Sequence, residues 1–244
     1  MTIVYWGKDK NFGDILTNDL LKYCEVEFKH VEDFKKANTF VIGSIARLAK
    51  DGDHVYGSGV YRYTDNINPK ANFHFVRGPL TREKIISQGG SCPEIYGDAA
   101  LLLPRFCEES KKEYEVGLTP NYITVRAGTG RLKRKHPDFK IINPNNNNPL
   151  NVAKEITKCK KIISGSLHGI ICAHAYGIPA AYAPMGKIYG DDIKFKDYFK
   201  SVGLEAIKST IEKPVYTDIK KQPDLDLIEE ILRSINQGDT NVNG

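Results

Sequence analysis

The length and composition of the chain favour a globular protein with one large or two small domains. Its 244 residues are 41% hydrophobic and 27% charged, which excludes a disordered or fibrous chain. The net charge of +5 reflects 35 basic and 30 acidic residues, and the densest basic run, at 131–136, has no interleaved aromatic residues. This pattern argues against a nucleic-acid partner and suits an anionic small substrate.

The spacing of the cysteines and the lengths of the apolar runs indicate the cellular compartment in which we expect the protein. The five cysteines are widely spaced and form no Cys-x-x-Cys pair, which favours reduced, packed thiols. The N-terminus has no apolar run of signal-peptide length, and glycine, proline and histidine interrupt the longest apolar stretch. We therefore expect a cytoplasmic, soluble protein.

Short β-rich runs that close on glycine alternate with helical patterns in the first half of the chain. The expected strands lie at 2–7, 39–44, 54–59, 73–78 and 94–98. Residues 14–23 and 79–90 have helical spacing, with Pro79 in a first-turn position. This alternation predicts an α/β fold with a mainly parallel sheet covered on both faces.

The charged segment 105–115 lacks a strand signal and marks the predicted domain boundary. We expect an N-terminal α/β domain over 1–106, on the acceptor side, and a C-terminal α/β domain over 115–236, on the donor side. The second domain closes with an amphipathic helix at 224–235, and 237–244 is predicted to be a loose tail. Two small α/β domains with a central cleft are the expected architecture.

Polar residues follow the predicted strands at their carboxyl ends. Ser44, Ser58, Arg77, Asp98 and the turn at 164–169 hold such positions. Ligands of open parallel sheets bind at this edge, so these residues are candidates to line one cleft. An arginine directly after an apolar strand suits a phosphate or carboxylate ligand, although pairing with an acidic neighbour such as Asp98 would also explain it.

The turn SGSLHG at 164–169 carries the strongest signal for a site. Gly165 and Gly169 permit close backbone approach, Ser164 and Ser166 offer hydroxyls, and the start of the following helix offers N–H groups to an anion. His168 stands in that first turn, where it is either a proton donor to an anionic substrate or a neutral packed residue. No third metal ligand lies nearby in sequence, so no metal site is expected.

The segment NFGD at 11–14 precedes a predicted helix. Asp14 is placed to act as the helix N-cap or as a base that accepts a proton from a substrate hydroxyl. The glycine-rich segment 55–60 matches neither a P-loop nor a dinucleotide fingerprint, so it is a weak phosphate motif.

Six segments of the chain share their order and character with a known family. They are NFGDILTNDLL, VYGSG, VRGPLTRE, YGDAALLLP, EITKCKKIISGSLHGIICAHAYGIP and KFKDYFKSVGLE. As a set, over about residues 3–205, they resemble the polysaccharide pyruvyl transferase family, and most closely its Ser-Leu-His-Gly branch of exopolysaccharide ketal-pyruvate transferases. The resemblance implies two Rossmann-like domains arranged as in GT-B glycosyltransferases, with phosphoenolpyruvate as the donor substrate and no cofactor.

The resemblance implies a donor role for His168, the histidine of the Leu-His-Gly segment. Combined with the chemistry of the residues, it predicts His168 as the general acid and Asp14 as the acceptor-side base. The predicted donor site comprises Arg77, Ser164, Gly165, Ser166, Leu167 and Gly169, and the predicted acceptor site comprises Asn11, Gly13, Ser58, Gly59 and Asp98. Asp98 is the second choice as base.

Ser166 departs from a common feature of that family. Many members carry arginine at this position, so one donor contact has to come from another residue. Arg77, Arg126, Lys160 and Lys187 are the candidates to supply the positive charge.

The expected reaction moves pyruvate from phosphoenolpyruvate onto two hydroxyls of a sugar, an oligosaccharide or a lipid-linked glycan, and the last of these allows peripheral association with membrane-bound precursors. One alternative is a nucleotide-sugar glycosyltransferase on the same architecture. Another is a non-catalytic glycan-binding relative. The sequence leaves the acceptor sugar undetermined.

Overall fold

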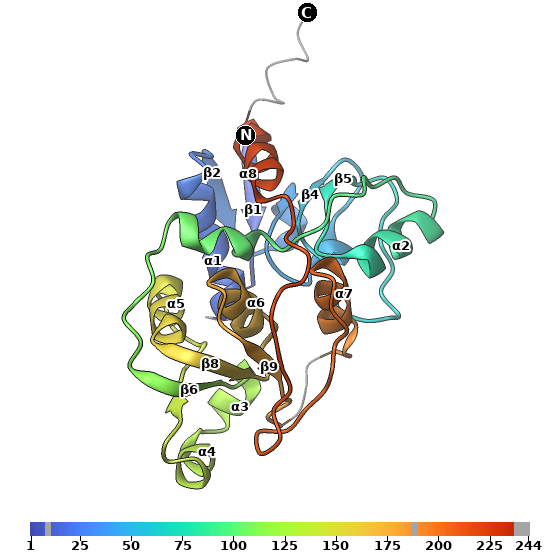
Figure 1. The fold of residues 1–244 in the computed structure, drawn as a ribbon. Helices are drawn as coiled ribbons and strands as arrows, with labels where there is room; N and C mark the ends of the chain where they lie inside the picture. The colour runs from blue at the N-terminus through green and yellow to red at the C-terminus, as the bar shows by residue number, and fades with distance from the viewer. Residues whose placement is uncertain (8–10, 187–189, 237–244) are drawn as a thin grey trace, which may run out of the picture.

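The computed structural model, which describes residues 1–7, 11–186 and 190–236, contains two five-stranded sheets (Figure 1). The strand order is β2-β1-β3-β4-β5 in the first sheet and β10-β9-β8-β6-β7 in the second. Neighbouring strands pair in parallel except β10 with β9. This confirms the predicted α/β fold with two Rossmann-like sheets.

The first half of the chain alternates strands with helices, as its glycine-closed apolar runs predict. Its elements are β1 (Thr2–Tyr5), α1 (Phe12–Tyr23), β2 (Phe28–Val31), η1 (Phe34–Lys36), β3 (Thr39–Phe40), η2 (Ala46–Leu48), β4 (His54–Tyr56), β5 (Asn72–Phe75), α2 (Pro79–Ser87) and η3 (Ala99–Arg105). The prediction of a strand at 94–98 is wrong, because this segment forms only an isolated bridge between Val76 and Tyr96. The chain then enters η3, where the Asp98 carboxylate accepts a hydrogen bond from Ala100 N.

In the second half, the turn predicted at 164–169 is followed by the predicted helix. Its elements are β6 (Tyr114–Thr119), α3 (Tyr122–Arg126), α4 (Gly130–Lys135), β7 (Lys140–Ile141), α5 (Pro149–Thr157), β8 (Cys159–Ser164), α6 (Leu167–Ala175), β9 (Ala180–Tyr182), α7 (Ile193–Ser201), β10 (Tyr216–Thr217), α8 (Leu225–Arg233) and η4 (Ser234–Asn236). Ile162 and Ile163 of β8 are both fully buried, as expected for a strand covered on both faces.

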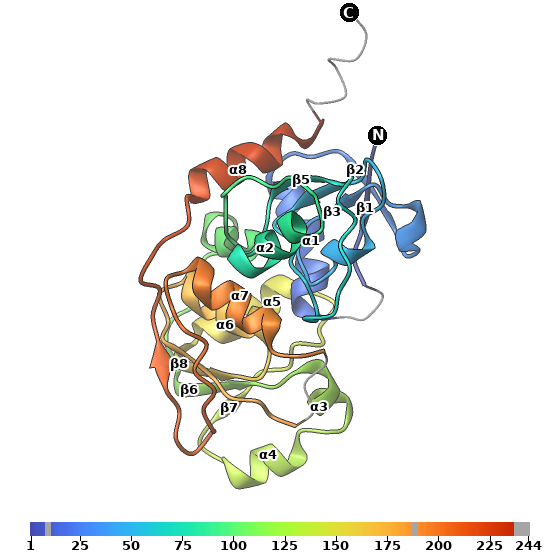
Figure 2. The same cartoon turned by 90° about the vertical axis from the view of Figure 1, so that its right-hand side faces the viewer.

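Helices fill the space between the two sheets (Figure 2). There α6 packs on η3 and on α5, and α1 packs on α5 and η3. One apolar cluster extends from Val4 of β1 through Leu16 and Leu102 to Ile162 of β8. The two halves therefore share a core, and residues 106–113 carry the chain from one half to the other.

The last helix, α8, lies against the N-terminal half although it follows the second sheet in sequence (Figures 1 and 2). Arg105 of η3 contacts Asp226 at 2.6 Å and Glu229 at 2.5 Å, and Tyr23 of α1 donates to Glu229 at 3.1 Å. The segment 237–244, predicted to be a loose tail, lies outside the described residues.

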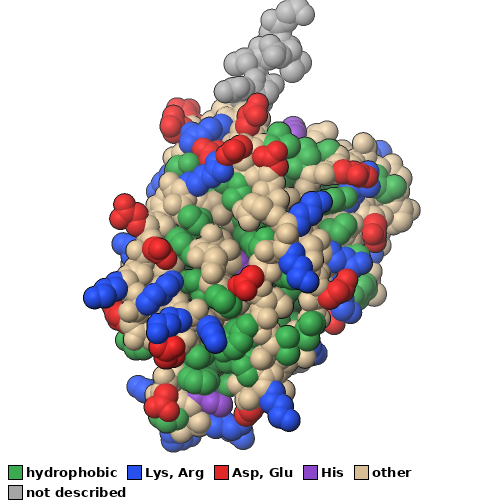
Figure 3. Space-filling model, viewed as in Figure 1, with side chains coloured by type: hydrophobic (Ala, Val, Ile, Leu, Met, Phe, Trp, Pro, Cys, Tyr) green, Lys and Arg blue, Asp and Glu red, His purple; other side chains and the backbone are tan. Residues whose placement is uncertain are grey.

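Charged side chains of both signs are interspersed over the face seen in Figure 3. Within residues 1–7, 11–186 and 190–236, no helix combines the length and apolar character needed to cross a membrane. The five cysteines are free and buried, as their spacing predicts.

Candidate functional site

A cavity of about 770 Å³ lies between the two halves, beyond the carboxyl ends of several strands. Residues from both halves of the chain form the wall of this cavity. The lining residues include Tyr5, Asn11, Asp14, Ser44, Arg47, Tyr61, Arg62 and Asp65 from the first half, and Asn121, Tyr122, Gly165, Ser166, Leu167, His168 and Lys194 from the second. The expected cleft is therefore present at the edge where parallel sheets bind ligands.

His168, in the first turn of α6, is enclosed by groups from the N-terminal half. Its Nε2 atom lies 3.5 Å from Oδ2 of Asp98, and both atoms are buried without another hydrogen-bond partner. On the other side, a β-carbon at Gly13 would lie 1.9 Å from Nδ1. The ring is thus held between the Asp98 carboxylate beside Nε2 and the Gly13 backbone beside Nδ1.

The turn at 164–169 divides into residues on the cavity wall and residues that shape it. Gly165, Ser166 and Leu167 line the cavity. Ser164 lies behind them, where its hydroxyl donates to Ser166 O at 2.7 Å and accepts from Ser166 N at 3.0 Å. A β-carbon at Gly169 would lie 2.5 Å from Ser164 Oγ, so glycine is needed there for this turn to close.

The start of α6 leaves polar backbone groups at the cavity. Ser166 is the N-cap residue, and its side chain makes no capping hydrogen bond. The first N–H groups of a helix have no intrahelical partner and carry the positive end of the helix dipole. Because 165–168 line the cavity, this helix end provides an anion-binding wall with a buried histidine in it.

Asp14 lines the cavity from the first turn of α1. The N-cap position of this helix is held by Asn11, whose side chain makes no capping hydrogen bond, and Asp14 lies in the first turn, so Asp14 is not the N-cap residue. Asn11 Nδ2 donates to Asp14 Oδ2 at 3.2 Å, and Gly7 and Gly43 lie close to the carboxylate. One element thus places a carboxylate on the wall and, through Gly13, contacts His168.

Arg77 does not line the cavity. Its side chain is fully buried, with Nη2 3.1 Å from Oδ2 of Asp197 on α7. The pairing considered in sequence therefore exists, with Asp197 in place of Asp98. Arg77 also donates to Ser44 Oγ at 2.8 Å and to Val60 O at 2.9 Å. Its guanidinium thus supports Ser44, a residue of the wall, and anchors α7.

Three residues of the predicted acceptor site also lie behind the wall. Ser58 is fully buried, and its hydroxyl donates to Gly43 O at 2.9 Å. At Gly59 a β-carbon would lie 2.3 Å from Cζ of Arg77. Asp98 is fully buried beside His168. These three residues therefore support the cavity wall from behind, whereas Asn11 lines the cavity itself.

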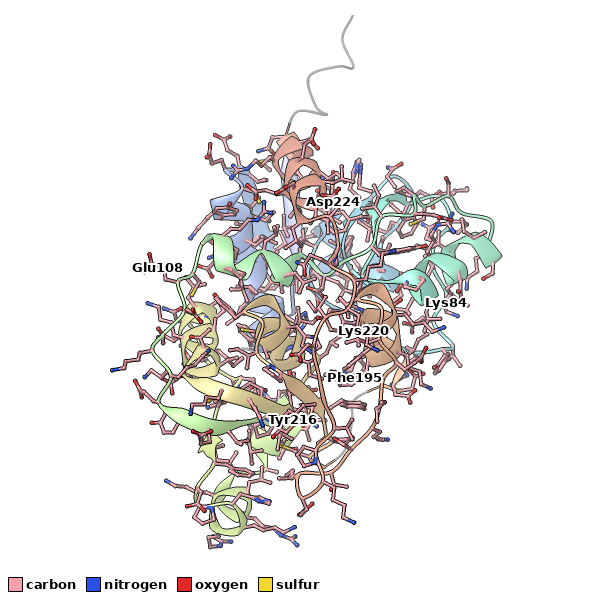
Figure 4. All side chains as sticks on the ribbon, viewed as in Figure 1. Lys84, Glu108, Phe195, Tyr216, Lys220 and Asp224 are labelled. Carbon is pink, nitrogen blue, oxygen red and sulfur yellow. The ribbon has the colours of Figure 1, made fainter. Side chains whose placement is uncertain are left out.

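Lys194 of α7 is a cavity residue that the sequence reasoning missed. Burial lowers the pKa of its ammonium to about 8, the Arg77 guanidinium acts in the same direction, and the Asp14 and Asp191 carboxylates oppose them. Its Nζ atom lies 5.7 Å from the centroid of the Tyr61 ring. The signal was a lysine between Ile193 and Phe195. This is the start of α7, which Figure 4 locates by the label Phe195.

The other cations considered in place of an arginine at position 166 have different surroundings. Lys160 is exposed and pairs with Glu115 at 2.5 Å, away from the lining residues. Arg126 is exposed, with its guanidinium 6.0 Å from the centroid of the Tyr122 ring. Lys187 lies outside the described residues.

His174, the second histidine of α6, is a packed residue. Its Nε2 atom lies 3.0 Å from Thr217 O, which can only accept, so Nε2 carries the proton and Nδ1 accepts from Tyr198 Oη at 3.0 Å. Burial lowers the pKa of His174 to about 4. No group of three or more potential metal ligands occurs among the residues that the structure describes.

Fold and site together define an α/β protein with a ligand cavity between two Rossmann-like halves. Residues 7–182 match the model of the polysaccharide pyruvyl transferase family. The chain therefore belongs to this family. The resemblance seen in the sequence is confirmed at the level of the family, and the Ser-Leu-His-Gly branch stays a prediction.

Two similar proteins show how much of a relative's length this chain covers and which solved structure shares its fold. The chain is 33% identical over 172 residues to an uncharacterized protein of Acanthamoeba polyphaga mimivirus; the match covers 67% of this chain and 60% of that protein. The chain thus spans about 60% of that relative's length. A crystal structure of an uncharacterized Klebsiella pneumoniae protein is similar in fold, with a TM-score of 0.50, 14% identity, and coverage of 82% of this chain and 87% of the other.

Proposed function

We propose that the protein transfers pyruvate from phosphoenolpyruvate onto two hydroxyls of a sugar or glycan precursor, forming a ketal and releasing phosphate. The observation that carries this proposal is the convergence of an acid, a base and a cation on one cavity. His168, Asp14 and Lys194 all line it, and they match the needs of that reaction. Membership of the pyruvyl transferase family supports the choice of donor.

The donor anion binds, in this proposal, between Lys194 and the first N–H groups of α6. Lys194 and residues 165–167 line the same cavity, and both the ammonium and the helix end carry positive charge. The half-buried ammonium supplies the charge that an arginine at position 166 would otherwise bring. Arg77 acts indirectly, through its hydrogen bond to Ser44 and its ion pair with α7.

The reaction requires one proton to enter the donor and two protons to leave the acceptor hydroxyls, one from each. Protonation of the methylene carbon of phosphoenolpyruvate creates an oxocarbenium-like centre, which the first sugar hydroxyl attacks as it loses its proton. The second hydroxyl then displaces phosphate, which departs with the remaining proton. General acid and base catalysis, with electrostatic stabilisation of the charged centre, is sufficient for these steps.

His168 is the proposed proton donor, and Asp14 the proposed base. The buried Asp98 carboxylate, 3.5 Å from Nε2, orients the ring and provides a counter-charge when the ring is protonated. The protonated ring then delivers its proton toward the cavity. Asp14 accepts the proton of an attacking hydroxyl, with Asn11 fixing one carboxylate oxygen at 3.2 Å.

A direct test combines donor binding with product detection. Phosphoenolpyruvate should stabilise the protein thermally, and phosphate release with a panel of sugars and glycan precursors should accompany a pyruvylated product seen by mass spectrometry. His168→Asn should lower turnover by about 10²–10⁴-fold without loss of folding. The matched control is His30→Asn, since His30 is exposed and stacks on Trp6 at 3.7 Å, outside the cavity.

Two outcomes would point elsewhere. Stabilisation by nucleotide sugars and not by phosphoenolpyruvate would replace this proposal with a glycosyltransferase. Phosphoenolpyruvate binding that is unaffected by His168→Asn, together with no turnover on any acceptor, would favour a non-catalytic glycan-binding protein.

A further inference from the structure

We propose that Ser44 donates a hydrogen bond to a hydroxyl oxygen of the sugar acceptor, beside Asp14, and that Arg77 and Ser58 position Ser44 for that contact. The inference rests on the proposed function, in which Asp14 accepts the proton of an attacking hydroxyl. It gives the acceptor a second contact with the protein, and it assigns Arg77 to the acceptor side of the site.

The Ser44 hydroxyl is oriented as a hydrogen-bond donor to the cavity. Ser44 lines the cavity, and its Oγ atom accepts a hydrogen bond from Nη1 of Arg77 at 2.8 Å. Because a guanidinium can only donate, this contact leaves the O–H group of the serine to donate elsewhere. Within the part of the chain that the structure describes, the O–H group of Ser44 donates to no protein acceptor, so a ligand in the cavity is the partner that it can serve.

Buried residues behind the wall fix the backbone on both sides of Ser44. Ser58 Oγ donates to Gly43 O at 2.9 Å and accepts from Ile45 N at 3.2 Å. Gly59 N also donates to Gly43 O, at 3.0 Å. A contact residue held by such a supporting shell is set in one geometry before the ligand arrives. Ser58 and Gly59, two of the predicted acceptor residues, therefore act on the acceptor through Ser44.

The charges around Ser44 favour a neutral ligand atom. Oδ2 of the buried Asp197 lies 3.1 Å from Nη2 and 3.2 Å from Nε of Arg77, so the cation behind the serine is already paired. The Asp14 carboxylate is close, since a β-carbon at Gly43 would lie 3.2 Å from its Oδ1 atom. An anionic oxygen placed here would be repelled by that carboxylate, whereas a neutral hydroxyl would not.

Asp14 and Ser44 together suit two neighbouring hydroxyls. The carboxylate of Asp14 accepts a hydrogen bond and the hydroxyl of Ser44 donates one, and a sugar hydroxyl can do either. One acceptor hydroxyl can thus donate to Asp14 while its neighbour accepts from Ser44. The residue before Asp14, Gly13, lies against His168, so the chain passes directly from the proposed acid to the proposed base. The ligand class is a neutral sugar bound through two adjacent hydroxyls.

The test compares acceptor and donor constants in Ser44→Ala. The acceptor probes are methyl β-D-galactopyranoside, methyl β-D-glucopyranoside and methyl α-D-mannopyranoside, in an assay of phosphate release from phosphoenolpyruvate. We expect acceptor KM to rise about three- to ten-fold, as for one lost neutral hydrogen bond, with kcat and phosphoenolpyruvate affinity within about two-fold of wild type. The matched control is Ser87→Ala, because Ser87 is exposed on α2 and its hydroxyl donates to Lys84 O at 2.9 Å, outside the cavity wall.

A cycle that pairs the variant with deoxygenated sugars ties the effect to one hydroxyl. Saturation-transfer NMR measures binding of the singly deoxygenated analogues of these hexosides. The analogue that lacks the contacted hydroxyl should bind wild type about as weakly as the parent sugar binds Ser44→Ala, and the two losses together should add little. If Ser44→Ala does not fold, as judged by circular dichroism, Ser44→Cys replaces it, because a thiol is a weak donor.

The possible results separate this inference from the proposed function. If Ser44→Ala weakens phosphoenolpyruvate binding and leaves acceptor KM unchanged, or changes neither, the acceptor contact is wrong. If no hexoside causes phosphate release but NMR detects binding that depends on Ser44, pyruvyl transfer fails and the hydroxyl contact stands. If none of the hexosides binds the wild type, the contact is contradicted, and thermal stabilisation by phosphoenolpyruvate would still support the donor assignment.

Discussion

Gly13 of α1 lies in contact with the imidazole of His168 on α6, so that a β-carbon at residue 13 would lie 1.9 Å from Nδ1. The contact joins the two halves of the molecule at the proposed general acid. It explains why glycine stands in NFGD directly before Asp14: the backbone must pass the histidine ring while the next side chain enters the cavity.

Gly13→Ala should therefore displace the His168 ring and lower turnover by about 10²-fold, as expected for a catalytic group moved by around 1 Å. Overpacking should also cost about 1–3 kcal/mol of unfolding free energy. Steady-state kinetics and urea unfolding measure the two effects.

Gly130→Ala is the control for this substitution. A β-carbon there would meet only Arg134 Nη1 at 3.6 Å, an ordinary contact. Wild-type turnover in Gly13→Ala would show that the ring position is not critical, and would remove support for His168 as the proton donor.

Arg77→Met should destabilise the protein by about 3–5 kcal/mol, because it leaves the fully buried Asp197 carboxylate without its counter-ion. Arg77→Met/Asp197→Leu should recover much of this loss. Denaturant titration measures the free energies, and Lys70→Met, which breaks the exposed pair with Asp51, should change stability by at most about 1 kcal/mol.

A different result for Arg77 would restore a direct role in donor binding. If Arg77→Met unfolds at the same urea concentration as the wild type but no longer responds to phosphoenolpyruvate, the guanidinium contacts the donor. Because the Arg77 side chain is buried in an ion pair, we expect Arg77→Met to lower the free energy of unfolding and do not expect a stable variant that has lost phosphoenolpyruvate binding.

The strand ends could be predicted from the sequence, but the direction of each side chain could not. Asp14 and His168 were recognised because each stands at the start of a helix that follows an apolar strand. Ser58 and Arg77 also follow apolar strands, yet both side chains point into the protein interior and are fully buried. Successive side chains of an extended segment alternate in direction, and tertiary packing decides which of them faces the ligand.

Lys194 was missed for another reason. The segment that forms α7 has a mixed pattern in which a lysine stands between Ile193 and Phe195, both buried. A lysine in such a place normally extends its charge to solvent. Only the packing of α7 against the N-terminal half, through Asp197 and Arg77, turns it toward the cavity.

Acid should destabilise the protein through His174. Burial holds its pKa at about 4, below the ordinary value near 6.5, so between these pH values the unfolded chain binds a proton that the native protein does not. Stability is full above pH 6.5 and falls as the pH drops toward 4, by about 3 kcal/mol in total for this group. Urea unfolding at several pH values measures the slope.

The matching variant is His174→Leu. It should be less stable at pH 7, because Thr217 O and Tyr198 Oη lose their partner, but its stability should fall less steeply between pH 6.5 and 4. The remaining slope is assigned in part to His74, whose pKa is also lowered to about 4 by burial and by the neighbouring His54. An unchanged slope would contradict the assignment to His174.

Donor affinity should fall as the pH rises through 8, because the Lys194 ammonium, whose pKa is lowered to about 8 by burial, loses its charge. Lys194→Arg should remove this dependence, since arginine stays charged, and Lys194→Met should bind phosphoenolpyruvate weakly at every pH. The same lowered pKa makes the free energy of unfolding rise between pH 8 and about 10.5. In this range the Lys194 side chain keeps its proton in the unfolded chain but has lost it in the native protein. Titration calorimetry from pH 6.5 to 9.5 measures the affinity, with Lys196→Met, on the same helix but outside the cavity wall, as the control. A pH-independent affinity in the wild type would show that the donor anion is held by the helix end alone.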